Sequence, residues 1–145
     1  MKTKPFIIGF LAIVALLAAV SIYFSAIVDR ADKTVAALAS PDGKFKAVRI
    51  TFVAGGAAPF CFDNVSVMFA AYPDEFAQRE KAYEVYAAPC GSFANREPSP
   101  KLEWLSGSEL KIAHAARPAA SNVKPMRTKN IDVTKSVHVT FVERE

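Results

Sequence analysis

Apolar residues occur in two patterns, one unbroken run near the N-terminus and several short alternating runs after it. The unbroken run covers residues 6–28 and contains no charged residue. At about 1.5 Å of rise per residue, a helix of this length spans a hydrocarbon core of about 30 Å. It also satisfies its own backbone hydrogen bonds, as lipid requires. We expect a transmembrane signal anchor at residues 6–28, in contact with the lipid bilayer. A short tail at residues 1–5 precedes it.

Two other interpretations stay open for this run, a cleaved signal peptide and a buried helix of a soluble domain. Cleavage is disfavoured because signal-peptide apolar regions usually span about 7–15 residues and end in a small-x-small site. Here Ala19 follows Leu17 by two residues, so it does not complete such a site. The purely basic tail, with Lys2 and Lys4, favours a cytoplasmic N-terminus and an exported C-terminal domain.

The alternating runs predict a domain of β-strands. The run at 44–53 places Val48, Ile50 and Phe52 on one face and polar residues on the other, the period of a half-buried strand. Similar runs occur at 60–72, 83–88, 101–105, 109–115 and 131–143. We expect about six strands in a small, mostly antiparallel β-sandwich or partly closed barrel at residues 41–145.

The segments between these runs have weaker patterns. Residues 29–40 are expected to be a juxtamembrane stalk that continues the helix for a turn or two. Residues 40–44 (SPDGK) form a turn signal, because proline presets φ and glycine accepts positive φ. Residues 74–82 predict a single helical turn or a loop. Residues 117–130 contain two prolines and predict a mobile loop outside the core.

The charge balance narrows the functional classes. The chain has 145 residues and a net charge of +4, but 16 basic residues (18 less Lys2 and Lys4) face 14 acidic ones after the anchor. A nucleic-acid-binding domain carries a large, clustered basic excess, so no nucleic-acid partner is expected. The segment from 111 to 135 is locally basic, and it predicts a surface that faces anions such as phospholipid headgroups, an anionic polysaccharide or an acidic partner. Its candidate residues are Lys111, Arg117, Lys124, Arg127 and Lys129. A solvated loop is the simpler alternative.

The two cysteines, Cys61 and Cys90, both follow the predicted membrane crossing. Exported domains keep disulfides, so these residues are expected to form one intramolecular bond with Cα atoms within about 7 Å. Free thiols and a metal site with His114 and His138 are the alternatives, but the spacings differ from those of structural zinc sites. We therefore expect no metal and no cofactor.

Catalytic signatures are absent from the sequence. Cys90 in its Gly-Ser-containing loop, or a histidine, is the only candidate for an enzymatic role, and no local motif supports it. His114 shares a strand face with Leu110 and Ile112, which indicates partial burial, whereas His138 falls on the polar face of its strand.

Several short motifs occur in a suggestive order. SPDGK at 40–44 precedes a strand, GGAAPF at 55–60 leads into NVSVM at 64–68, and a tryptophan strand turns into LKI at 110–112. This order resembles a family of small, N-terminally membrane-anchored bacterial envelope proteins of unknown function. Gly55 stands where that family often has a cysteine. The resemblance implies an envelope protein and supplies no catalytic residues.

These observations together favour a single-pass protein of the inner membrane whose exported β domain is a binding or interaction module. Its partner would be a protein or an envelope polymer, and an inhibitor or immunity-like role falls within this class. A small envelope enzyme that uses Cys90 or a histidine is the alternative.

Overall fold

The computed structural model describes residues 12–23, 32–55, 60–116 and 126–145. The chain divides into two compact units, Met1–Asp32 and Lys33–Glu145. In the first unit, residues 12–23 form an α-helix. Within the described residues, no helix has both the length and the apolar character that a membrane crossing needs. The remainder of the predicted anchor at 6–28 lies outside the described residues.

From residue 32 onward, the described residues form ten strands, one short α-helix and one 3₁₀ turn. Their bounds are β1 Asp32–Ala39, β2 Phe45–Ala54, β3 Phe60–Phe69, α2 Phe76–Arg79, η1 Lys81–Tyr83, β4 Glu84–Pro89, β5 Gly91–Ser92, β6 Pro98–Ser99, β7 Lys101–Ser106, β8 Glu109–Ala115, β9 Arg127–Thr128 and β10 His138–Arg144. The prediction of a mostly β domain is therefore confirmed. Of the two alternatives for residues 74–82, a helical turn or a loop, the structure shows the helical turn.

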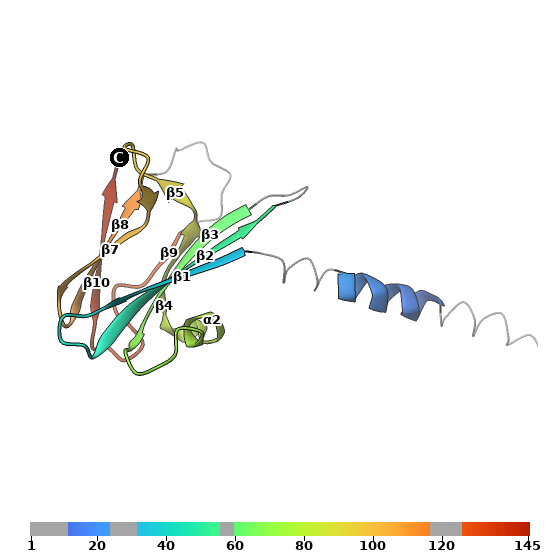
Figure 1. Cartoon of the computed structure of the whole chain (residues 1–145), viewed down its shortest axis with the longest axis horizontal. Helices are drawn as coiled ribbons and strands as arrows, with labels where there is room; N and C mark the ends of the chain where they lie inside the picture. Colours follow the sequence, from blue (N-terminus) through green and yellow to red (C-terminus); the bar gives the residue numbers. More distant parts are fainter. Residues whose placement is uncertain (1–11, 24–31, 56–59, 117–125) are drawn as a thin grey trace, which may run out of the picture. The chain divides into compact units, whose positions relative to one another are not determined.

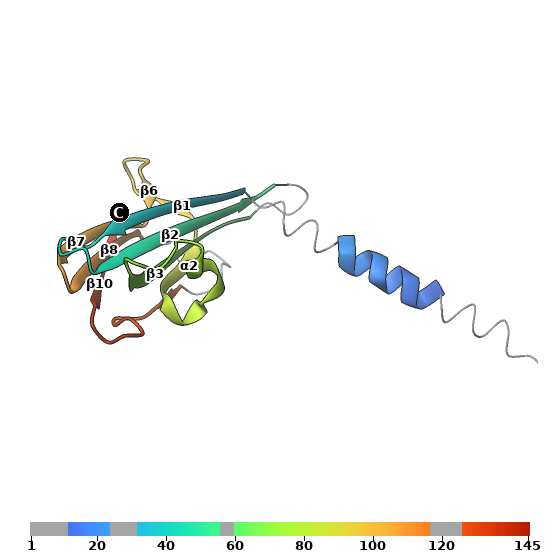
Figure 2. The same cartoon turned by 60° about the horizontal axis from the view of Figure 1, so that its bottom comes forward.

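The strands form three sheets, with the orders β1-β2-β3-β4-β9, β10-β8-β7 and β5-β6. Strands β2, β3, β4 and β9 pair antiparallel in succession, as do β7 and β8. Strand β10 instead pairs parallel to β8. Between these two strands the chain crosses to the larger sheet, where it forms β9, and such a crossover connection allows parallel pairing. The described strands form no closed barrel. Both views show β7, β8 and β10 grouped on one side of the larger sheet (Figures 1 and 2).

Apolar side chains from the two larger sheets form a common core. Val65 and Val67 on β3 belong to the same buried cluster as Leu110 and Ile112 on β8. The opposite face of the larger sheet has its own cluster, in which Ile50 packs with Met68 of β3 and Ala77 of α2. The predicted apolar face of β2 is therefore covered by α2 and η1. The opposite face, which was expected to be polar and solvated, contributes Phe45 and Ala47 to the common core, so β2 is buried on both faces.

Two predictions about the connecting segments are corrected. The stalk expected at 29–40 is a strand from Asp32 to Ala39, at the edge of the larger sheet, and every one of its residues is exposed. Within the loop expected at 117–130, Met126 packs against the core and Arg127–Thr128 form β9 beside β4. Residues 117–125 lie outside the described residues.

The SPDGK turn has the predicted chemistry. Ser40 Oγ donates to Asp42 Oδ1 at 2.7 Å, and Gly43 has a φ of +70°. This turn lies against the β7–β8 turn, since a Cβ atom on Gly107 would stand 2.7 Å from an Asp42 oxygen. Glycine at 107 therefore allows the two turns to meet.

Candidate functional site

Three basic side chains converge at one edge of the larger sheet. Lys81 begins η1, Arg127 begins β9, and Lys129 follows β9. Together with Glu84, Val85 and Tyr86 they line a cavity of about 120 Å³, which we call the basic pocket. Sequence reasoning selected Arg127 and Lys129, and the fold adds Lys81 to them.

Glu84 is the only carboxylate among the residues that line the basic pocket, and it is 8% exposed. Its Oε2 atom accepts a hydrogen bond from Asn64 Nδ2 at 2.8 Å and lies 3.3 Å from Lys81 Nζ. Its Oε1 atom lies 3.3 Å from an Arg127 guanidinium nitrogen. In the sequence, Glu84 alternates with Tyr83 and Val85, a pattern that predicts a solvent-facing side chain, and the burial of Glu84 shows that this prediction is wrong. The buried carboxylate instead holds two cations at the mouth of the pocket.

The electrostatics of the basic pocket favour an anion. Three cations face one carboxylate, which leaves a local excess of two positive charges. The side chains of Lys81 and Arg127 are 61% and 71% exposed, so both can reach a ligand in solvent. Lys129 is anchored by its backbone N–H to Val85 O at 2.8 Å, and its Nζ lies 3.4 Å from Ala82 O. Its ammonium group pairs with no carboxylate of the described residues.

The other predicted anion-facing residues do not join this pocket. Lys111 on β8 forms an ion pair with Glu103 on β7, and this contact lowers the pKa of Glu103. Arg117 and Lys124 lie outside the described residues. The described residues of the basic segment are therefore found in two places. Lys111 is paired on the smaller sheet, and Arg127 and Lys129 line the basic pocket at the edge of the larger sheet.

The predicted disulfide is confirmed. Cys61 on β3 and Cys90 after β4 are bonded, with Cα atoms 5.3 Å apart, and Cys90 N donates to Cys61 O at 3.1 Å. A nucleophilic cysteine needs a thiolate, and the sulfur of Cys90 is occupied while the bond persists. His114 is buried with its ring 6.2 Å from that of Tyr86, and His138 is exposed on β10. Within the described residues, no three metal-binding side chains gather.

Sequence reasoning missed a second polar cluster inside the fold. Asp63 on β3 is fully buried, and its Oδ1 accepts from Arg49 Nε at 3.0 Å and from Thr51 Oγ1 at 2.6 Å. Arg49 also donates to the carbonyl oxygens of Ser99 and Pro100 at 3.1 Å. The signal was the adjacent pair Asp63-Asn64 within an apolar strand, where two polar residues require partners.

Comparison with known proteins adds no relative. No protein-family model matches the chain, and no match was found among curated proteins or solved structures. The chemistry of the described residues therefore carries the functional argument.

Proposed function

We propose that the chain is a membrane-tethered binding module of the cell envelope, whose β domain holds anionic groups of an envelope polymer in the basic pocket. Residues 6–28 would cross the inner membrane, residues 1–5 would lie in the cytoplasm, and the β-sandwich would be exported. The uncharged run of 23 residues supports the anchor. The Cys61–Cys90 disulfide supports export, because such bonds persist in oxidising compartments.

The convergence of Lys81, Arg127 and Lys129 carries the binding part of this proposal. A cavity of about 120 Å³ is smaller than the roughly 300–1,000 Å³ of sites that enclose small molecules. It fits one anionic group, such as a sulfate, phosphate or carboxylate, that belongs to a larger molecule. The exposed lysine and arginine side chains can reach that group while the remainder of the polymer stays in solvent.

Binding to a polyanion tests this proposal. Full-length protein in nanodiscs of uncharged lipid should bind immobilised dextran sulfate, ignore uncharged dextran, and release the polymer as salt rises. The triple variant Lys81→Met, Arg127→Met, Lys129→Met should lose this binding. Lys129→Met alone should lose part of it, and it leaves both ion pairs of Glu84 intact.

A matched control separates the pocket from the overall charge. The triple variant Lys33→Met, Lys44→Met, Arg96→Met removes the same number of charges from exposed positions that do not line the pocket. It should bind as the unaltered protein does. Equal losses in both triple variants would reject the basic pocket. A stoichiometric acidic protein captured only by the unaltered chain would replace the polymer as the partner.

Topology is tested separately. A reporter that works only outside the cytoplasm, fused after Glu145, should be active, because the β domain is proposed to be exported. Activity of a cytosol-only reporter at the same position would reject the orientation and leave the basic pocket to be judged by the binding experiment.

A further inference from the structure

A second cavity lies away from the basic pocket, between the β5–β6 loop and the end of β10. It measures about 260 Å³, and we call it the Arg144 cleft. Its lining residues are Phe93, Ala94, Asn95, Glu97, Lys101, Arg144 and Glu145. Phe93 is 8% exposed, so its ring is a fixed apolar surface in this lining.

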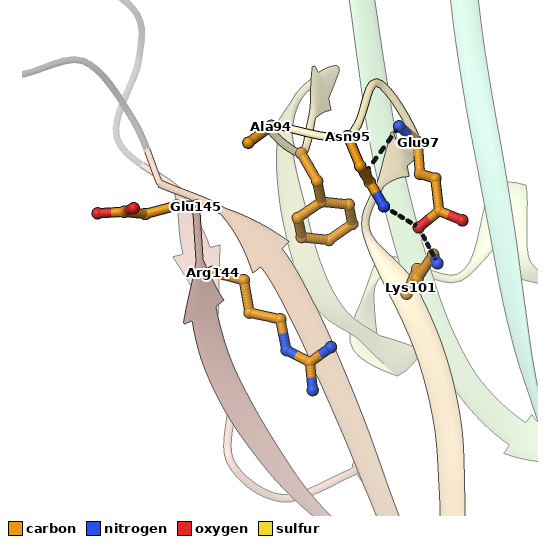
Figure 3. A pocket seen from close by; sticks show the side chains of 7 residues that line it. Ala94, Asn95, Glu97, Lys101, Arg144 and Glu145 are labelled. Carbon is orange, nitrogen blue, oxygen red and sulfur yellow. Dashed lines mark hydrogen bonds and ion pairs between the residues drawn. The ribbon is translucent and has the colours of Figure 1, made fainter.

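The loop side of the Arg144 cleft is internally paired. Asn95 Nδ2 donates to Glu97 Oε2 at 2.8 Å, and Lys101 forms an ion pair with the same carboxylate. These contacts, Lys101 first, lower the pKa of Glu97. The backbone closes the loop, with Phe93 N donating to Glu97 O at 2.9 Å. Figure 3 shows this chain of contacts along one side of the cleft. These contacts hold the loop in place and pair the charges of Lys101 and Glu97 with each other.

Arg144 on the opposite side differs from these paired groups. Within the described residues no carboxylate forms an ion pair with its guanidinium, although its charge helps to lower the pKa of Glu103. In Figure 3 the Arg144 side chain extends toward the side on which Lys101 lies, and the Glu145 side chain extends the other way. The cleft therefore combines an arginine that has no ion-pair partner among the described residues with a buried aromatic residue, Phe93, in the same lining.

We propose that the Arg144 cleft is a binding site for a small carboxylate with an apolar body. The planar guanidinium of arginine matches a carboxylate with two parallel hydrogen bonds. Phe93 and Ala94 supply the contact for the apolar body. The Glu97 carboxylate in the same lining opposes a second negative charge, so a monocarboxylate fits better than a dianion. This site is independent of the basic pocket.

Titration with 3-phenylpropionate tests the site directly. In full-length protein in nanodiscs, the probe should shift the NMR signals of the Arg144 side-chain N–H groups and the Phe93 ring, and the shifts should saturate together. The neutral amide analogue should bind at least tenfold more weakly, because it offers no charge to the guanidinium. Acetate should bind more weakly than the probe, since it lacks the apolar body.

Variants decide whether Arg144 makes the contact. Arg144→Met should abolish the saturable shift at the Phe93 ring, and Arg144→Lys should weaken it, because a lysine keeps the charge and loses the two parallel donors. Arg96→Met removes an exposed charge from the same loop without touching the cleft, and it should bind as the unaltered protein does. An absence of saturation, equal binding of the amide, or an equal loss in Arg96→Met would each overturn the proposal.

Discussion

Two buried carboxylates on neighbouring strands of the larger sheet have opposite surroundings. Asp63 on β3 is fully buried, and its cation, Arg49, is itself half-buried and bonded to backbone carbonyls. Glu84 on β4 is nearly as buried, but its cations, Lys81 and Arg127, are mostly exposed. In the first cluster every charge is fixed by the protein. In the second, the carboxylate fixes cations that remain available to a ligand.

The difference separates a structural ion pair from a binding site. A buried carboxylate is costly unless it is paired, so both acids need their cations. Arg49 uses its remaining donors to tie the segment Ser99–Pro100 to β2. The side chains of Lys81 and Arg127 are mostly exposed, so their remaining N–H donors face solvent. Loss of a cation should therefore reduce stability in the first cluster and ligand binding in the second.

The largest expected effect belongs to Arg49→Met. This change leaves the Asp63 carboxylate buried without its cation and removes two bonds to backbone carbonyls. Breaking a buried pair in this way costs about 3–5 kcal/mol of unfolding free energy. Urea unfolding of the full-length protein would measure it. The double variant Arg49→Met, Asp63→Leu should recover part of the loss, and no recovery would show that the carbonyl contacts dominate.

Removal of the disulfide should have a comparable but smaller effect. Cys61→Ala with Cys90→Ala opens a loop with a sequence separation of 29. The chain-entropy model then gives a loss of about 3–4 kcal/mol. Urea unfolding under oxidising and reducing conditions would measure it. Reduction should destabilise the unaltered protein and leave the double variant unchanged; equal sensitivity of both would contradict the assignment.

The Asp132 loop provides a third kind of carboxylate, which is paired only with neutral donors. Burial raises its pKa, but hydrogen bonds from Thr134, Ser136 and Val137 outweigh burial and lower it below 3.8. A lowered folded pKa gives stability that is present above the unfolded value and is lost as the pH falls through the folded pKa.

Asp132→Asn should therefore destabilise the protein at neutral pH by about 1–3 kcal/mol, because the amide accepts fewer of these bonds. The difference between variant and unaltered protein should begin to shrink below about pH 4, the ordinary aspartate pKa at which the unfolded chain takes up its proton. It should go on shrinking as the pH falls through the lowered folded pKa of Asp132. Unfolding free energies measured from pH 7 to pH 2.5 would check this, and a constant difference across that range would contradict it.

Local patterns predicted much of the fold. The alternation along β2, β3 and β8, the SPDGK turn and the β7–β8 hairpin are encoded by neighbouring residues. Strand β1 was not predictable, because DKTVAALA has no clear alternation and its pairing with β2 decides its conformation. The parallel pairing of β10 with β8 depends on a long crossover connection, and no pattern among neighbouring residues predicts such a connection.

The candidate site shows the same limit. Arg127 and Lys129 stood out as part of a basic segment, but Lys81 belongs to an ordinary polar stretch. Strand alternation predicts a solvent-facing Glu84, and local sequence gives no sign of its partners Asn64 and Arg127, which are distant along the chain. Burial of this carboxylate arises from tertiary contacts alone.

The smallest effect on stability, and the sharpest test of the comparison, belongs to Lys81→Met. Asn64 and Arg127 still hold Glu84 in this variant, and Lys81 is mostly exposed. An exposed ion pair contributes about 0–1 kcal/mol, so the urea midpoint should move little. Binding of dextran sulfate should nevertheless fall several-fold, because one of three cations is gone. The Arg49→Met variant, measured without urea and at a temperature at which it stays folded, should bind dextran sulfate as the unaltered protein does. Lys81→Met that unfolds as easily as Arg49→Met would show that both carboxylates are structural, and the distinction between the two clusters would fail.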